Sequence, residues 1–86
     1  MKTVSVKIDN MDLVYDTALE IARILAEKDN DLAMLISWYD KKEGKHSPAA
    51  VHCEINGAPG WEVYGENHEG RIKIIINERE YVFIYS

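Results

Sequence analysis

The sequence contains little of what several classes of protein require. Its 86 residues include one cysteine, Cys53, so no disulfide can form within the chain and a disulfide-stapled secreted scaffold is excluded. No apolar run approaches the roughly 20 residues of a membrane span, and residues 1–10 lack the apolar core of a signal peptide. Only two prolines and five glycines are present, which argues against disorder. We therefore expect a folded cytoplasmic protein with no membrane partner.

Positive charge is also scarce. Ten Lys and Arg residues stand against fifteen Asp and Glu residues, and the formal net charge is −5. This balance opposes attraction to the phosphates of nucleic acid or anionic lipid, so we expect no nucleic-acid partner. One basic cluster stands out, formed by Lys41, Lys42 and Lys45 with His46 beside it. It is either a solvated hairpin turn or a place where a small anion binds.

One long helix is indicated between residues 13 and 28. Apolar residues recur there at spacings of three and four, and charged residues occupy the opposite side. The members of this apolar stripe are Val14, Ala18, Ile21, Ala22 and Leu25. A chain of this length forms a single domain, residues 1–86, and buries only about 60–65% of its unfolded surface.

Five or six strands are expected around the helix. Alternating or β-rich segments occupy residues 3–8, 32–39, 50–55, 61–66, 72–76 and 81–85. Residues 41–48, which contain Gly44 and end in Pro48, predict a hairpin loop, and Asn56 with Gly57 predicts a tight turn. The order predicts an α+β two-layer sandwich, with one helix packed on a largely antiparallel sheet.

The terminal hairpin is apolar on both faces. If Glu78 and Arg79 are the turn residues, Ile76 lies opposite Tyr81. The other apolar side chains of the hairpin then point to both faces of the sheet. A helix is about 10 Å wide, whereas six strands span more than about 24 Å, so one helix leaves much of the sheet uncovered. The residues expected at a contact with a second chain are Ile75, Tyr81, Val82, Phe83, Ile84 and Tyr85. Our first interpretation is a non-enzymatic interaction module that forms a homodimer through this sheet face.

A second interpretation is a domain that binds a small molecule or anion. The loop over residues 41–46 supplies cations, and nearby aromatic side chains can line a pocket for a planar ligand. The candidate ligand-binding residues are Tyr39, Asp40, Lys41, Lys42, Lys45, His46 and Trp61. The alternative role for Trp38 and Trp61 is that of ordinary core residues.

A catalytic or metal site has weaker support. Asp40, His46 and Ser47 match a hydrolytic triad in residue type only, because no nucleophile elbow surrounds Ser47. The available metal ligands are His46, His52, Cys53 and His68. Their spacing matches no structural zinc pattern, and neighbours in a strand such as His52 and Cys53 point to opposite faces. We expect no metal and no cofactor, and a non-enzymatic role is favoured over an enzymatic one.

Four segments resemble those of a small prokaryotic single-domain family of unknown function. They are SWYDKK at 37–42, GKHSP at 44–48, PGW at 59–61 and YVFIY at 81–85. The resemblance spans nearly the whole chain. It implies a stand-alone α+β domain, and it implies no activity, cofactor or catalytic residue.

Overall fold

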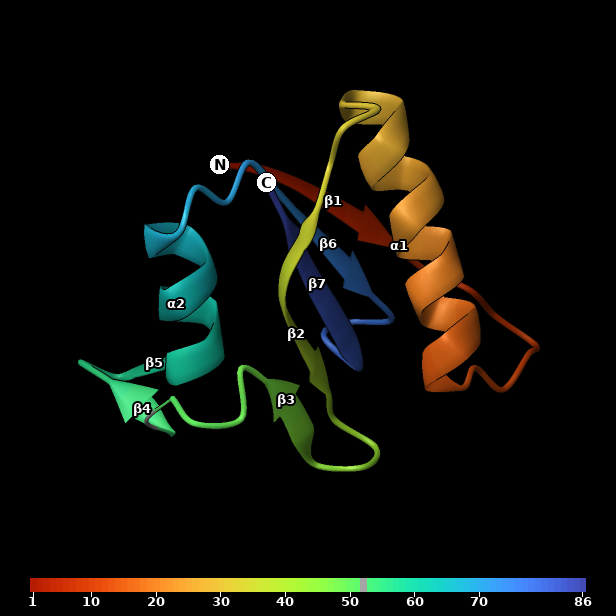
Figure 1. The fold of residues 1–86 in the computed structure, drawn as a ribbon. Coiled ribbons are helices and arrows are strands. Elements are labelled where there is room, and N and C mark those ends of the chain that lie inside the picture. The colour runs from red at the N-terminus through yellow and green to blue at the C-terminus, as the bar shows by residue number, and fades with distance from the viewer. Residues whose placement is uncertain (52) are drawn as a thin grey trace.

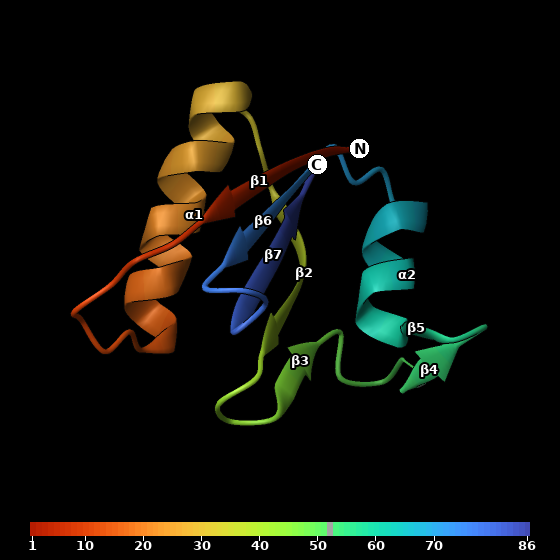
Figure 2. The same cartoon turned by 180° about the vertical axis from the view of Figure 1, so that it is seen from behind.

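The computed structural model of the chain describes residues 1–51 and 53–86. The central sheet consists of β1 (Lys2–Val6), β2 (Leu35–Asp40), β3 (Lys45–Ser47), β6 (Ile72–Ile76) and β7 (Tyr81–Tyr85). Within the described residues the other elements are helices α1 (Tyr15–Asp29) and α2 (Gly60–Asn67) and a small hairpin of β4 (Glu54–Ile55) and β5 (Ala58–Pro59). The central sheet lies between α1 and α2 (Figures 1 and 2). The predicted α+β class is confirmed.

The strands of the central sheet follow the order β1-β6-β7-β2-β3, so the terminal hairpin lies in its middle. β6 pairs with β7 in the predicted register, with Ile76 opposite Tyr81. β7 pairs antiparallel with β2, and β2 with β3, whereas β1 runs parallel to β6. The sheet is therefore mixed. α1 carries the chain across one face of the sheet, so that β1 and β2 are not neighbours and the hairpin of β6 and β7 lies between them.

α1 packs on the sheet through its smallest side chains. Ala18, Ala22 and Ala26 are completely buried, and their spacing of four residues places them on one side of the helix. Alanine ends at Cβ, so the helix approaches the sheet closely above Ile74 and Phe83, which belong to the same core cluster. The helix predicted over residues 13–28 is present, although the first residue of its apolar stripe, Val14, is 61% exposed.

α2 covers the opposite face of the sheet, and the strand predicted over residues 61–66 was wrong. Trp61 and Gly65 are four residues apart and both are buried, while Glu62 and Glu66 both pair with Lys73. These residues fit a helix period of 3.6, but over so short a window they also fit the alternation of a strand. The chain thus places a helix on each face of the sheet, where the sequence had indicated only one.

The segment between β2 and α2 also differs from prediction. Gly44 adopts a positive φ of 63°, which closes a tight turn, and β3 follows it inside the region predicted as a loop. Within the strand predicted over residues 50–55, Glu54–Ile55 forms a strand and pairs with β5. His52, one of the candidate metal ligands, lies outside the described residues.

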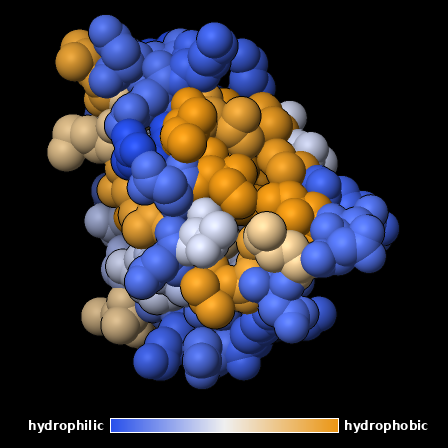
Figure 3. All heavy atoms as spheres, turned by 90° about the vertical axis from the view of Figure 1, so that its right-hand side faces the viewer, coloured by the Kyte–Doolittle hydropathy of each residue, from blue (hydrophilic) through white to orange (hydrophobic). Residues whose placement is uncertain are grey.

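Several large apolar side chains remain at the surface. Figure 3 looks onto the α1 side of the molecule and shows apolar groups gathered over the middle of that face. Ile24 of α1 is 55% exposed, and in the connection from α1 to β2 Leu32 and Met34 are 79% and 70% exposed. In the described part of the chain, no helix combines the length and apolar character needed to cross a membrane.

Candidate functional site

The pleat of β2 separates the predicted ligand-binding residues into two groups. Tyr39 and Lys41 line a hollow on the α2 side of the sheet, whereas Asp40 and Lys42 line one on the α1 side. The cross-strand partner of Tyr39 is His46, which joins the α2 side. Residues that are consecutive in sequence therefore contribute to two different sites.

The hollow on the α2 side, hereafter the aromatic pocket, has a volume of about 500 Å³. It is lined by Tyr39, Lys41, His46, Cys53, Pro59, Trp61, Glu78 and Arg79. Four of these were among the seven predicted ligand-binding residues. The pocket combines an aromatic wall with cationic groups, in a chain that is acidic as a whole.

The aromatic wall is a stacked pair from two elements. The rings of Tyr39 in β2 and Trp61 in α2 lie 5.2 Å apart between centroids, with an angle of 9° between their planes. Trp61 is 3% exposed and packs with Val82 and Ile84 in the core beneath α2. Trp61 is therefore a core residue, as one of its two expected roles required, and it also borders the pocket.

Arg79 enters the pocket from the turn between β6 and β7. Its guanidinium carbon lies 5.7 Å from the centroid of the Trp61 ring, a distance suited to a cation–π contact. Two hydrogen bonds, of 2.8 and 3.3 Å, join the guanidinium to the carboxylate of Glu62. This fork-shaped contact fixes the plane of the guanidinium beside the aromatic wall.

Glu62 is the anchor of this arrangement. Its carboxylate accepts hydrogen bonds from both Arg79 and Lys73. Burial opposes ionisation of the carboxyl group, but the hydrogen bonds from these two cations outweigh it and lower the Glu62 pKa below its ordinary value of 4.5. Glu62 therefore stays charged at neutral pH and holds α2 to the terminal hairpin.

The turn that supplies Arg79 is conformationally unusual. Asn77, Glu78 and Arg79 all have positive φ, at 51°, 56° and 75°. Asparagine tolerates this conformation, and its side chain accepts a hydrogen bond of 2.8 Å from the backbone N–H of Ile8. Glu78 and Arg79 have no such advantage, so the turn is strained where it borders the pocket.

Lys41 and His46 complete the polar rim. Lys41 forms no ion pair with any of the described residues, so its ammonium group is available to a ligand. The Nδ1 atom of His46 lies 3.0 Å from the carbonyl oxygen of Pro48. A carbonyl oxygen only accepts, so Nδ1 carries the hydrogen and Nε2 remains for another partner.

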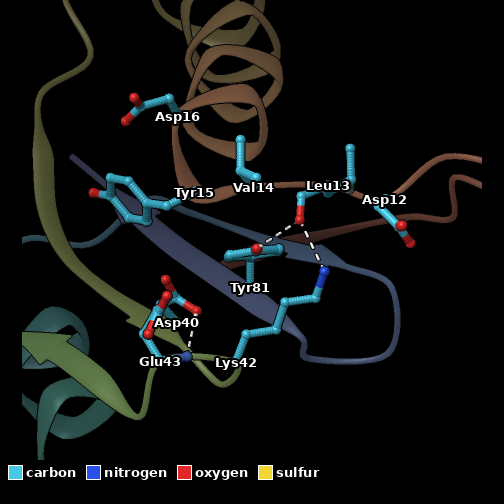
Figure 4. A pocket seen from close by; sticks show the side chains of 9 residues that line it. All are labelled: Asp12, Leu13, Val14, Tyr15, Asp16, Asp40, Lys42, Glu43 and Tyr81. Carbon is cyan, nitrogen blue, oxygen red and sulfur yellow. Dashed lines mark hydrogen bonds between the residues drawn. The ribbon is translucent and has the colours of Figure 1, made fainter.

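The hollow on the α1 side is shown in Figure 4 and is hereafter the Asp40 pocket. It has a volume of about 620 Å³ and is lined by Asp12, Leu13, Val14, Tyr15, Asp16, Asp40, Lys42, Glu43 and Tyr81. Lys42 extends along its edge to the carbonyl oxygen of Leu13 at 2.8 Å. Lys45 lines neither this hollow nor the aromatic pocket, and it borders a shallower one with Trp38.

The residues expected at a self-association surface lie inside the chain. Five of them are between 0% and 4% exposed, and these are Tyr81, Val82, Phe83, Ile84 and Tyr85. Ile75 is partly buried and packs against the cluster that contains Trp61. The expectation of an uncovered sheet face was incorrect because α2 covers it, and five of these six side chains are buried within the chain.

The hydrolytic triad also does not assemble. Because His46 is the cross-strand partner of Tyr39, it lies on the opposite face of the sheet from Asp40. Among residues 1–51 and 53–86, no group of three or more His, Cys, Asp or Glu side chains is placed to hold a metal ion.

Four residues that line the aromatic pocket were not among the predicted ligand-binding residues, and these are Glu78, Arg79, Pro59 and Cys53. Glu78 and Arg79 were correctly placed in the turn, but nothing in the sequence indicated that the turn folds over α2. That contact depends on the helix at residues 60–67, which was read as a strand. The signal that was available is the pair Pro59 and Gly60, because proline is common just before or at a helix start.

Known proteins resemble this chain in sequence and in structure. A protein of Archaeoglobus fulgidus described as uncharacterized is 34% identical over 72 residues, which cover 84% of this chain and 75% of that protein. The crystal structure of a novel protein from Archaeoglobus fulgidus matches with a TM-score of 0.82 at 27% identity, over 100% of this chain and 93% of that one. The family described as a domain of unknown function, DUF5619, matches residues 1–85, and the chain belongs to this family, as the resemblance of its four segments had implied.

Proposed function

We propose that this domain binds a small, planar molecule with one negative charge in the aromatic pocket. The observation that carries the proposal is the convergence of the stacked Tyr39 and Trp61 rings with Arg79 and Lys41 around one hollow of about 500 Å³. Aromatic walls favour flat ligands, and a few convergent cations fix the orientation of an anionic group.

The position of the pocket in the fold supports the proposal. β2 and β6 both run antiparallel to β7, so they are parallel to each other. Lys41 follows the carboxyl end of β2, and Glu78 and Arg79 follow the carboxyl end of β6. Ligands of open α/β sheets bind at this end of parallel strands.

The strained turn is a second source of support. A left-handed conformation costs roughly 1–2 kcal/mol for a residue with a side chain, and glycine would remove that cost. The chain nevertheless has Glu78 and Arg79 at two such positions. A requirement for the Arg79 side chain in the pocket accounts for this, since strained residues concentrate at functional sites.

The charges limit the ligand to a monoanion. Arg79 already shares its charge with Glu62, and Glu78 adds a carboxylate to the rim. Lys41 is then the cation with no partner among the described residues, and the chain as a whole carries a net charge of −5. A flat aromatic carboxylate fits this balance, whereas a polyphosphate would meet net repulsion.

Isothermal titration calorimetry with three probes tests the proposal. We expect 2-naphthoate, which is flat and anionic, to bind at least tenfold more tightly than cyclohexanecarboxylate or 2-naphthalenemethanol, each of which lacks one of the two properties. Lys41→Ala should weaken naphthoate binding about fivefold, the effect of losing one partly exposed charge contact. Lys45→Ala is the matched control and should change nothing, because Lys45 lies outside the pocket. Equal affinities for the three probes would contradict the proposal.

Self-association is a second candidate, on a surface different from the one first expected. The apolar side chains over α1 (Figure 3) and the exposed Ile24 support it, because a twofold contact between copies reuses one patch. Sedimentation velocity at micromolar concentration should then give the mass of a dimer, and Ile24→Lys should give a monomer. A wild-type protein that sediments as a monomer at every concentration would exclude it.

A further inference from the structure

β1 is an edge strand with unpaired backbone groups on its outer side. The strand order places it at one end of the central sheet, next to β6 (Figure 2). Lys2 donates its backbone N–H to the carbonyl oxygen of Arg71 at 2.9 Å, so the backbone of Lys2 faces β6. Every second residue of a strand faces the same neighbour, and the N–H and C=O groups of Thr3 and Ser5 therefore point outward. Among the described residues these groups have no hydrogen-bond partner.

The two edges of the sheet differ in how they are protected. Edge strands are ordinarily kept from pairing with other chains by short length, proline, bulges or charge. β3, at the opposite edge, is three residues long and is followed by Pro48. β1 has five residues, contains no proline and pairs with β6 in an unbroken register. The lysines at its ends have carboxylate partners within the chain, Lys2 with Asp29 at 2.6 Å and Lys7 with Glu78 at 3.9 Å.

The sequence of β1 is complementary to itself in the antiparallel direction. When two copies of Lys2–Val6 overlap over their full length, Thr3 lies opposite Ser5 of the second copy, and Val4 lies opposite its own counterpart. The outward groups make Thr3 and Ser5 a pair that exchanges both backbone hydrogen bonds, and the Val4 pair is then the closely spaced kind. Thr3 and Ser5 are exposed, whereas Val4 packs on the core beneath α1. Each cross-strand pair therefore joins side chains of the same kind.

The helices leave room for a second copy at this edge. α1 packs mainly over β6 and β7, and α2 packs over β2 and β7. With strands about 4.8 Å apart, α1 and its twofold copy would lie about 19 Å apart. A helix is about 10 Å wide, so the two helices would not collide.

We propose that two copies of this chain pair through β1, antiparallel about a twofold axis at Val4, and join their central sheets into one continuous sheet. Both copies use the same edge, so the contact closes on itself, whereas pairing of β1 with β3 of another copy would continue into a filament. One strand from each copy forms a small contact, and we expect a weak, reversible dimer. This surface is different from the apolar patch over α1, and the proposal does not depend on ligand binding in the aromatic pocket.

Amide hydrogen exchange of the full chain at about 1 mM tests this contact. We expect Thr3→Pro to speed exchange of the Ser5 amide at least tenfold, because proline removes the outward N–H of residue 3 and leaves the N–H groups that face β6 in place. Sedimentation equilibrium at the same concentration should show a dimer for the wild type and a monomer for Thr3→Pro. Thr3→Val keeps the outward N–H, so this matched control should behave as the wild type.

Three outcomes would overturn the proposal. They are a wild type that is monomeric at about 1 mM, a Ser5 amide that exchanges as fast as an unpaired one, and a dimer that persists in a folded Thr3→Pro variant. A contact through the patch over α1 would leave the Ser5 amide unprotected, so the exchange rate separates the two surfaces. If Thr3→Pro fails to fold, protection of the Ser5 amide in the wild-type dimer still decides the question.

Discussion

At the scale of single residues, Glu62 links the fold to the candidate site. It joins Lys73 of β6 and Arg79 of the turn to α2, and it orients Arg79 beside Trp61. The ion pair is largely shielded, since the side chains of Glu62 and Lys73 are each 12% exposed. Such a pair contributes more than one at the open surface, where the typical contribution is about 0–1 kcal/mol.

Glu62→Gln should destabilise the protein in a manner that depends on pH. The pKa of Glu62 is lowered on folding, so its contribution is complete above the ordinary value of 4.5 and is lost as pH falls through the lowered value. Urea unfolding at pH 7 should show the variant about 1.5–3 kcal/mol less stable, as for hydrogen bonds to charged groups. At pH 3 the difference should shrink.

The control for this measurement is Glu54→Gln. Glu54 is exposed and has no ion pair with the described residues, so its variant should match the wild type at both pH values. An equal loss of stability for Glu62→Gln at pH 7 and pH 3 would show that the charge of Glu62 does not hold α2 to the hairpin.

At the scale of elements, the contact between α2 and the sheet depends on a glycine. A Cβ atom at Gly65 would lie 2.6 Å from Oγ of Ser37 and 2.7 Å from Cδ1 of Ile84. Both neighbours are completely buried, and Ser37 Oγ has no hydrogen-bond partner in the described residues. The helix can therefore approach the sheet this closely only where its side chain is a hydrogen atom.

Gly65→Ala should lower the free energy of unfolding by about 1–3 kcal/mol, since overpacking outweighs the gain in helix propensity of about 1 kcal/mol. Ser37→Ala removes the nearest atom and a buried hydroxyl without a partner, so it should be neutral or stabilising. In the Ser37→Ala background the loss caused by Gly65→Ala should be smaller. Denaturant unfolding of the four proteins measures this coupling, and strictly additive effects would contradict the packing that we describe.

The same elements show how far the sequence predicts the fold. The amphipathic helix and the register of the terminal hairpin follow from long or strongly patterned segments, and both are present. α2 was missed because eight residues hold little more than two turns, too few to separate a period of 3.6 from a period of 2. Its identity is settled by packing of Trp61 and Gly65 on the sheet, which is a tertiary effect.

At the scale of the whole molecule, self-association through the terminal hairpin was expected because the sequence had not indicated α2. A sheet with one helix would expose Val82 and Ile84, and self-association through them was a reasonable consequence. With α2 in place these residues are completely buried. The chain therefore covers both faces of the central sheet with its own helices, and two of its hollows lie on either side of β2.

The composition of the candidate site was partly predictable. Tyr39, Lys41, His46 and Trp61 were correctly grouped near one another, because a hairpin and aromatic residues imply a shared surface. Asp40 and Lys42 could not be separated from them without knowing which side of β2 each side chain takes. Arg79 was not predictable, since its place depends on α2 and on the left-handed turn together.

The indole signals of the protein provide the most direct test of the central claim. The chain has two tryptophans, of which Trp61 borders the aromatic pocket and Trp38 packs against the tilted ring of Tyr15 on the other face of the sheet. Titration with 2-naphthoate in ¹H–¹⁵N spectra should move the indole N–H signal of Trp61 saturably and leave that of Trp38 in place. A Trp61 signal that stays fixed up to saturating naphthoate, or a shift confined to Trp38, would contradict the account.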